Sequence, residues 1–351
     1  MPLAATLVVL PLLTLVLTLG AHTAALALFP RWNLLDFPER YGLKRSKLPY
    51  PTGVLTVALF LAVYAAAEGW SPRSIAMMGA VLLLAGACFI DDRRQLHPLP
   101  RLGAQLAAAL LVVLTGDCVG GQICSVTNPL ESVAGGAVLD LHGTSPLLAI
   151  AVTAGWLIVT TNALNWFDGV PGQTHTISAI GFTTIGLLSL SDRVGQPELA
   201  LLSFVLAALA LGALPFDFPP ARTVPGDTGA MFFGFMLGVL TIYAGGKIAT
   251  GFLALGVPLL DSIFVVVRRI RAGVSPLRGS ARGEHLHHRL LAAGWSARTI
   301  IACNAAFGGT FGVMALFLST SGKALAGLAL LGMLLLLSAS LRDERISDPR
   351  T

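Results

Sequence analysis

The sequence predicts an all-α polytopic integral membrane protein, because its composition is strongly apolar and its apolar runs are long. Of the 351 residues, 55% are hydrophobic and only 12% are charged, whereas soluble domains average about 25% charged residues. A helix needs roughly 20 apolar residues to cross a bilayer, and runs near this length recur along the whole chain. We therefore expect one membrane domain over residues 1–351, with about ten or eleven transmembrane helices.

The first apolar run, residues 3–29, is expected to be a retained helix. A signal peptide carries positive charge before its apolar core and small residues after it, but Arg31 is the first basic residue of this chain. After 3–29, the predicted spans are 53–67, 73–90, 102–115, 146–163, 175–190, 198–215, 229–244, 249–267, 298–319 and 324–341. The second span, 53–67, and the fourth, 102–115, are short.

The basic residues predict the orientation of these spans. Only four of the 23 Lys and Arg residues lie on one side of the membrane (Arg73, Arg193, Lys247 and Lys323), which leaves 19 for the other side. Cytoplasmic loops carry the excess of Lys and Arg, so we expect the N-terminus outside and the C-terminus in the cytoplasm. The cytoplasmic loops are then 31–52, 91–101, 164–174, 216–228 and 268–297. Because the basic residues are split among short loops without interleaved aromatics, nucleic-acid binding is not expected.

The longest external loop, 116–145, contains no Lys or Arg. Cys118 and Cys124 lie in it, separated by five residues that include two glycines. An oxidising exterior permits a disulfide between them, and two free thiols are the alternative. The β-branched and glycine-rich residues 125–143 could form a small external β-hairpin.

Most acidic, amide and imidazole side chains are expected at the cytoplasmic ends of spans. The groups are Asp91 and Asp92; Asn162, Asn165 and Asp168; Asp217 and Asp227; Asp261; and His285, His287 and His288.

Most of these groups also have a structural alternative. The two adjacent acids could be a helix-end charge pair beside Arg93 and Arg94, and Asp227 could be an N-cap of the eighth helix. Asp261 could pair with a nearby arginine, and the histidines could lie in a solvated loop.

Taken together, these residue types favour metal-dependent phosphate chemistry at the membrane surface. Adjacent carboxylates repel each other unless a cation or a proton lies between them. Asp oxygens with Asn carbonyls suit a hard cation such as Mg²⁺, with Mn²⁺ as the substitute, and Mg²⁺ is usually bound by one or two carboxylates plus substrate phosphates. Glycines beside the acids, such as Gly169 and Gly226, let a backbone approach a phosphate closely. Arg and His donors suit a diphosphate.

The ordered motifs resemble a known enzyme superfamily. They are "DD" after one span, "NALNWFDG" after another, "PPARTVPGDTGA" before a third and "HLHH" in the longest cytoplasmic loop. This set resembles the polyprenyl-phosphate N-acetylhexosamine-1-phosphate transferases (glycosyltransferase family 4), and the "HLHH" spelling is closest to the undecaprenyl-phosphate GlcNAc-1-phosphate branch. The resemblance covers residues 33–292, including the first cytoplasmic loop and the "PLLDSIFVVVRRIRAGVSP" segment.

The resemblance implies the reaction and a cellular setting. A polyprenyl phosphate attacks the β-phosphate of a nucleotide sugar, usually a UDP-sugar such as UDP-GlcNAc, and a nucleoside monophosphate leaves. This is a first membrane step of cell-envelope polysaccharide assembly, such as lipopolysaccharide or cell wall. It implies an inner-membrane protein with a cytoplasmic active site, and a homodimer is a further expectation of the family.

The resemblance also implies roles for individual residues of this chain. The expected catalytic carboxylates are Asp91, Asp92, Asp168 and Asp227. Asp227 is the expected Mg²⁺ ligand with Asp92, and Asp91 is the expected base of the acidic pair. A larger set is expected to bind the sugar nucleotide and its diphosphate: Asn162, Asn165, Asp168, Gly169, Asp217, Arg268, His285, His287 and His288.

Several positions depart from the family pattern where the nucleotide should bind. Val224 and Pro225 replace a Phe-Met pair whose aromatic ring is expected to stack on the base, Asp217 replaces an Asn, and Pro171 replaces the Asp of a second Asp-Gly pair. An altered base or sugar, or a weakened enzyme that only binds lipid, are therefore alternatives. A transporter is the other alternative, since intramembrane charges mark ion paths. However, only Asp261 is expected deep in a span, and the two halves of the chain do not resemble each other.

Overall fold

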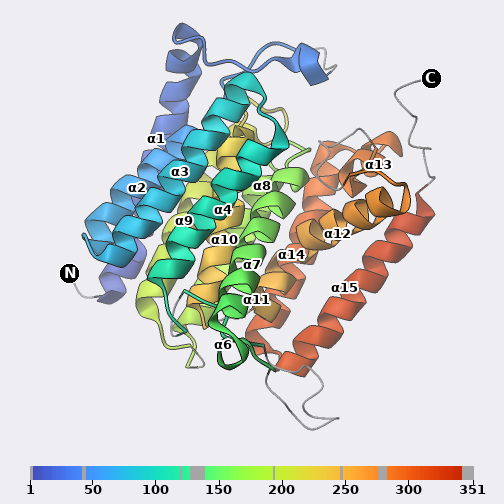
Figure 1. Ribbon diagram of the computed structural model, residues 1–351. Coiled ribbons are helices and arrows are strands. Elements are labelled where there is room, and N and C mark those ends of the chain that lie inside the picture. Colours follow the sequence, from blue (N-terminus) through green and yellow to red (C-terminus); the bar gives the residue numbers. More distant parts are fainter. Residues whose placement is uncertain are drawn as a thin grey trace.

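The computed structural model describes residues 3–41, 45–118, 121–126, 139–192, 194–245, 248–275 and 283–341, and these form a bundle of long helices (Figure 1). The predicted all-α membrane class is confirmed. The helices are α1 (Leu3–Arg31), α2 (Gly53–Glu68), α3 (Pro72–Arg94), α4 (Pro98–Thr115), α6 (Leu141–Thr144), α7 (Pro146–Phe167), α8 (Gln173–Leu190), α9 (Pro197–Asp217), α10 (Gly226–Tyr243), α11 (Ile248–Ala254), α12 (Gly256–Arg271), α13 (Leu286–Ala292), α14 (Ala297–Phe317) and α15 (Thr320–Ser340), with a 3-10 turn η1 at Pro38–Tyr41.

The membrane spans follow the hydropathy of the sequence closely. Within the described residues, eight helices are long and apolar enough to cross a membrane: α1, α3, α4, α7, α9, α10, α14 and α15. Helix α2 is apolar but has only 16 residues. Helix α8 carries buried polar side chains, including Gln173, Thr174 and Ser178. Each of these two helices coincides with a predicted span.

The predicted ninth span, 249–267, is not one straight helix. It is broken between α11 and α12, whose axes differ by 87°. The sequence explains the break, because Gly256 and Pro258 follow Leu255 closely and proline cannot donate the hydrogen bond that a continuous helix would need. In Figure 1, α12 crosses the bundle at a steep angle and ends beside α13. The bend therefore carries the end of α12 to the short helix that holds the histidines.

Two helices extend further than hydropathy predicts. Helix α3 continues through Asp91 and Asp92, beyond the predicted end at residue 90, and α7 continues through Asn165, beyond the predicted end at residue 163. The sequence pattern places the end of each span where polar residues begin, but these side chains find partners inside the protein, so the helical turns persist. The candidate residues are therefore held on rigid helix ends rather than on loops.

Helix α10 lies at the centre of the bundle, with almost all of its side chains buried. Two of its glycines face α7: a Cβ at Gly234 would lie 2.6 Å from the Thr160 carbonyl oxygen, and one at Gly238 would lie 2.4 Å from Thr160 Oγ1. Small residues at such crossings let two membrane helices approach closely. The close crossing fixes the start of α10 relative to the end of α7.

The segment before α2 pairs with the segment before α10 at the same end of the bundle. The amide of Val224 donates to the Pro49 carbonyl, the amide of Thr52 donates to the Val224 carbonyl, and the amide of Gly53 donates to the Pro225 carbonyl, each at 3.0 Å. A Cβ at Gly53 would lie 2.2 Å from the amide nitrogen of Gly229. The two backbones can therefore touch only because both positions are glycine.

The opposite end of the bundle carries the cysteine loop. Cys118 and Cys124 are joined by a disulfide with an S–S distance of 2.07 Å. Strands β1 (Ser125–Val126) and β2 (Leu139–Asp140) pair antiparallel with Ser125 opposite Asp140. Residues 127–138 of the expected hairpin lie outside the described residues.

We predict that Gly53→Ala lowers the unfolding temperature and that Gly79→Ala does not. The added methyl of Gly53→Ala would overlap the α10 backbone, and overpacking of this kind costs about 1–3 kcal/mol. Gly79 lies inside α3, and, apart from the backbone of its own helix, no atom of the described residues lies within 4 Å of the position that a Cβ would occupy there; alanine also favours helix over glycine. Thermal unfolding of the two purified variants in detergent is the measurement. Equal unfolding temperatures would show that the 49–53 contact is not tightly packed.

Candidate functional site

One arginine joins two of the predicted carboxylates. Arg101 Nη1 lies 2.7 Å from Asp91 Oδ2 and 2.8 Å from Asp227 Oδ2. Asp91 comes from the last turns of α3, Arg101 from the first turn of α4 and Asp227 from the first turn of α10. A guanidinium between two carboxylates removes the repulsion that they would otherwise exert on each other. The structure thus builds an acidic site around one cation.

Arg101 is a site residue that the sequence motifs do not single out. The sequence marks it only as one of the basic residues of a cytoplasmic loop. The available signal is its position, since it is the one Lys or Arg between the "DDRR" segment and the next apolar run. Its Nε atom is buried and has no hydrogen-bond partner among the described residues, so the guanidinium keeps donor capacity beyond the two carboxylates.

Asp92 has different partners from its neighbour Asp91. Its Oδ1 accepts hydrogen bonds from the Asp227 amide at 2.8 Å and from the Tyr50 hydroxyl at 2.6 Å. Its Oδ2 accepts from the Thr228 amide at 3.1 Å and from Thr228 Oγ1 at 2.6 Å. Neither acid pairs with Arg93, whose guanidinium donates instead to the carbonyls of Leu35 and Asn33. The structure therefore differs from the alternative in which these two acids form a charge pair with Arg93 at the end of the helix.

The two asparagines of α7 face different partners. Asn165 Nδ2 donates to Asp227 Oδ1 at 2.9 Å, so this amide belongs to the acidic site. Asn162 Nδ2 donates to Gln105 Oε1 at 2.6 Å and to the Ile158 carbonyl at 2.8 Å. Gln105 is buried one turn beyond Arg101 on α4. Asn162 therefore ties α7 to α4 behind the acidic site instead of facing it.

Asp168 follows the last residue of α7 and is partly buried. Burial, together with the negative charges of Asp217, Asp227 and Asp92, raises the pKa of its carboxyl well above the usual value. The carboxylates that the sequence groups together are thus within electrostatic reach of one another.

The residue after Asp168 is a glycine that packs against the histidine helix. Gly169 contacts His287 so closely that a Cβ would lie 1.8 Å from His287 Nε2. Only glycine fits there.

Asp217 turns away from the acidic site and into the protein. Its Oδ2 accepts from the Gly172 amide and lies 2.8 Å from His175 Nδ1, the same distance as from that amide. The Asp217 and His175 side chains are 4% and 2% exposed. The Asp217 carboxylate is therefore directed at a histidine and at the loop that carries Asp168, and not into the acidic site.

The histidines pack against the end of α7. His285 Nδ1 lies 2.7 Å from Asp261 Oδ2, and Asp261 Oδ1 accepts from the Leu286 amide at 2.8 Å. Asp261 therefore pairs with a histidine rather than with the arginine that the sequence suggests. His287 stacks on His285 with ring centroids 5.5 Å apart. Burial, and next the charge of His288, lowers the pKa of His287 to about 3, so this ring is neutral at pH 7.

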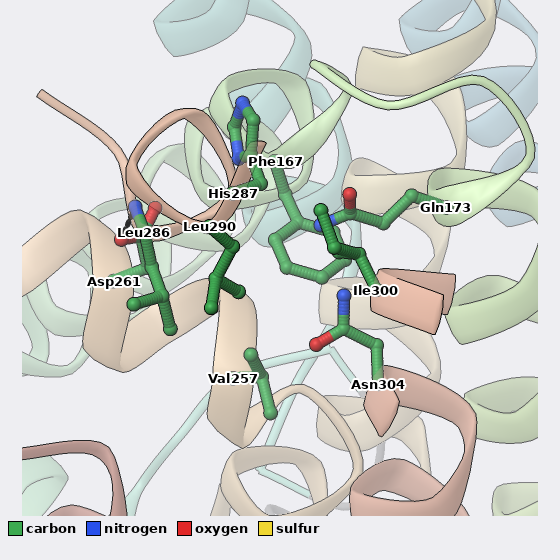
Figure 2. A pocket seen from close by; sticks show the side chains of 9 residues that line it. All are labelled: Phe167, Gln173, Val257, Asp261, Leu286, His287, Leu290, Ile300 and Asn304. Atoms are coloured by element: carbon green, nitrogen blue, oxygen red, sulfur yellow. Dashed lines mark hydrogen bonds between the residues drawn. The ribbon is translucent and has the colours of Figure 1, made fainter. Parts of the chain in front are cut away.

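A small cavity lies under the histidine helix. Figure 2 shows side chains from α7, α8, α12, α13 and α14 around it, among them Phe167, Gln173, Asp261, His287 and Asn304. Its volume is about 10 Å³, close to the space that one water molecule needs. The cavity is therefore far too small for a nucleotide sugar.

Two arginines of α12 hold the chain that leads into α13. Arg268 donates to the carbonyls of Glu284 and Phe264, and Arg269 Nη2 lies 2.5 Å from Glu284 Oε2. The Arg269 guanidinium also lies over the Trp166 ring, 5.5 Å from its centroid. These contacts hold His285 against α7. Residues 276–282 of the same loop lie outside the described residues.

The acidic site has the donor set of a hard divalent cation. Asp91 and Asp227 each direct one carboxylate oxygen at the same nitrogen of Arg101, and carboxylate oxygens are ligands that suit a hard divalent cation such as Mg²⁺. The only compact group of three His, Cys, Asp or Glu ligand atoms in the described part of the chain is Cys118, Cys124 and His142, and its cysteines form the disulfide. A cage made of protein ligands alone is thus not present among the described residues.

The fold and site together define a polytopic membrane protein whose acidic site is assembled from several helix ends. The chain belongs to glycosyl transferase family 4, whose family model matches residues 74–245. It is 30% identical to the "Probable undecaprenyl-phosphate N-acetylglucosaminyl 1-phosphate transferase" of Bacillus subtilis strain 168 over 294 residues, which are 82% of this chain and 78% of that protein.

Two further relatives carry related names. The decaprenyl-phosphate N-acetylglucosaminephosphotransferase of Mycolicibacterium smegmatis is 34% identical over 252 residues, 65% of this chain and 58% of that protein. The undecaprenyl-phosphate alpha-N-acetylglucosaminyl 1-phosphate transferase of Escherichia coli K12 is 26% identical over 303 residues, 81% of this chain and 77% of that protein. The family that the motifs suggest is therefore confirmed.

We predict that Asp217→Ala is strongly destabilising. It would leave His175 and the Gly172 amide without their buried acceptor, and each buried donor left without a partner costs about 1–3 kcal/mol. Asp192→Ala is the matched control, because Asp192 is exposed just after α8. Denaturant unfolding in detergent measures both. The buried-pair interpretation fails if the two variants unfold at the same denaturant concentration.

Proposed function

We propose that this protein transfers N-acetylglucosamine 1-phosphate from a UDP-sugar to a membrane polyprenyl phosphate. The observation that carries the proposal is the meeting of Asp91, Asp227 and Arg101 at one end of a membrane bundle, in a chain related to polyprenyl-phosphate sugar-phosphate transferases. The products are a polyprenyl-diphospho-sugar and UMP. Such a product would start the assembly of a cell-envelope polysaccharide.

The reaction exchanges one phosphorus–oxygen bond for another. An oxygen of the lipid phosphate bonds to the β-phosphorus of the nucleotide sugar, and the bond from that phosphorus to the bridging oxygen breaks. The bridging oxygen leaves with UMP. Little covalent chemistry is required of the protein, so positioning and neutralisation of charge supply most of the catalysis.

The residues of the site are suited to these two tasks. Arg101 has donor capacity beyond its two carboxylates and would bind phosphate oxygens. Asp91, released from Arg101 by an incoming phosphate, would accept a proton from the lipid phosphate and leave it a better nucleophile. Asn165 orients Asp227 by donating to Oδ1, which leaves Oδ2 directed into the site.

Mg²⁺ fits this donor set, with Asp227 as the side chain that would hold it. When bound, it would neutralise the diphosphate charge in the transition state. His287, neutral at pH 7, and His285, oriented by Asp261, would contact the substrate as hydrogen-bonding groups at the edge of the site beside Gly169.

The site is proposed to face the cytoplasm, in the inner membrane. The loops at the end of the bundle that carries the acidic site also hold most Lys and Arg residues of the chain, as cytoplasmic loops do. A homodimer remains an expectation from the family. Family membership disfavours the transporter alternative.

The test is an assay with purified protein, Mg²⁺, polyprenyl phosphate and a panel of nucleotide sugars. We expect a lipid-linked product whose mass equals polyprenyl phosphate plus the sugar phosphate, with release of UMP. No product with any nucleotide sugar would overturn the proposal and favour a relative that only binds lipid. Product from a different base would show that the departures at Val224 and Pro171 change specificity.

We predict that Asp227→Asn lowers turnover by about 10²-fold or more, the scale of one lost transition-state contact. The fold should persist, because Asp227 is 31% exposed and does not cap α10 with its own side chain. Asp140→Asn is the matched control: Asp140 lies at the opposite end and caps α6 by accepting from the Gly143 amide, which Asn also does. Wild-type turnover in Asp227→Asn would remove Asp227 from the site.

A further inference from the structure

The second acid of the "DD" pair is fully engaged by protein donors. A carboxylate offers about four acceptor positions, and the two oxygens of Asp92 receive four hydrogen bonds at 2.6 to 3.1 Å. The residue is only 6% exposed. Gly226 lies against the same carboxylate, where a Cβ would come 2.7 Å from Oδ2. No side of this carboxylate is open to a further ligand.

Two of these donors belong to the first turn of α10. The first amides of any helix lack intrahelical acceptors and carry partial positive charge. Helix α10 follows Pro225 and has no capping side chain of its own. Asp92 supplies the cap from another helix, because it accepts from the amides of Asp227 and Thr228. Asp227 is thereby free to direct its own carboxylate at Arg101 and Asn165.

We infer that Asp92 is a positioning residue for the transfer reaction rather than a metal ligand. It holds the start of α10, and so the Asp227 carboxylate, in place. To bind a metal it would have to leave two buried helix amides without their acceptor. This inference rests on the proposed function, and it replaces the expectation that Asp92 shares the metal with Asp227.

Tyr50 gives the arrangement a third anchor. Its hydroxyl reaches Asp92 from the segment that pairs with residues 224 and 225 through Pro49, Thr52 and Gly53. Asp92 therefore joins the end of α3, the start of α10 and the segment before α2. Changes to the Tyr50 hydroxyl and the Thr228 side chain remove donors to Asp92 while leaving the carboxylates of Asp91 and Asp227 in the chain.

The experiment compares Asp92→Asn, Tyr50→Phe and Thr228→Val, with Asp227→Asn as the metal-ligand control. Asn replaces one acceptor oxygen by a donor, so Asp92→Asn should lower kcat by about tenfold or more, the loss expected when two helix amides lose a charged acceptor. Tyr50→Phe and Thr228→Val each remove one donor, so each should lower kcat severalfold. In all three variants the Mg²⁺ concentration for half-maximal rate should rise far less than in Asp227→Asn, because the Asp227 carboxylate is displaced but kept, and the KM for the nucleotide sugar should stay close to the wild-type value. In Asp227→Asn the Mg²⁺ requirement should rise by about tenfold or more, because a metal-binding carboxylate is lost.

Two readouts do not depend on turnover. Binding of Mn²⁺, followed by electron paramagnetic resonance, should be kept in Asp92→Asn and lost in Asp227→Asn. Thermal unfolding should show that Asp92→Asn and Thr228→Val each lower the unfolding temperature, with the double variant no lower than the worse single variant. If wild type lacks transferase activity, the proposed function fails, and these two readouts still decide the role of Asp92.

Three results would overturn the inference. One is a loss of Mn²⁺ binding, or a rise in the Mg²⁺ requirement, in Asp92→Asn that equals the effect of Asp227→Asn. Another is wild-type kcat in both Tyr50→Phe and Thr228→Val. The third is an additive loss of stability in the double variant. Should Asp92→Asn fail to fold, the kcat, metal dependence and stability of Tyr50→Phe and Thr228→Val carry the test.

Discussion

The ion pairs of Arg101 with Asp91 and Asp227 hold together the rest of the acidic site. Each carboxylate is at the end of an apolar helix, where desolvation and mutual repulsion oppose the charged forms. One guanidinium relieves both carboxylates at once, at 2.7 and 2.8 Å. It also joins three helices, α3, α4 and α10, at the end of the bundle to which α7 brings Asn165. In the proposed reaction a substrate phosphate would meet the same guanidinium, so binding would exchange one set of charge contacts for another.

Close packing of the backbone fixes the positions of these charged side chains relative to one another. Helix α10 is packed on α7 through Gly234 and Gly238, and its first turn is packed on the segment before α2 through Gly53 and Gly229. Such close backbone contacts leave little freedom for rotation or sliding. The bend between α11 and α12 performs a similar task for the histidines, because it redirects the chain toward the end of α7. Small residues and one break therefore set the positions of the polar side chains.

The sequence predicts the helices well and the pairing of side chains less well. Long apolar runs are a local property of the sequence, so every predicted span coincides with a helix or a helix pair. The bend at Leu255 is not predicted, because the apolar character of a segment does not indicate whether its helix changes direction. Partner choice is a tertiary property. Asp91 and Asp92 are adjacent, yet one pairs with Arg101 and the other with Thr228, 136 residues later. Asp217 and Asp261 likewise find histidines that hydropathy and spacing do not connect with them.

The sequence distance between Asp92 and its partners has a consequence for biosynthesis. The amide that caps against Asp92 lies 135 residues further along the chain, so α3 leaves the ribosome long before α10 exists. During that interval the nascent α3 can keep its two acids solvated at the membrane surface, and Arg101, ten residues later, is already present to pair with one of them. Insertion of α10 is then the event that closes the acidic end of the bundle. A chain that ends before α10 therefore leaves the Asp92 carboxylate without the two amides from which it accepts hydrogen bonds in the finished protein.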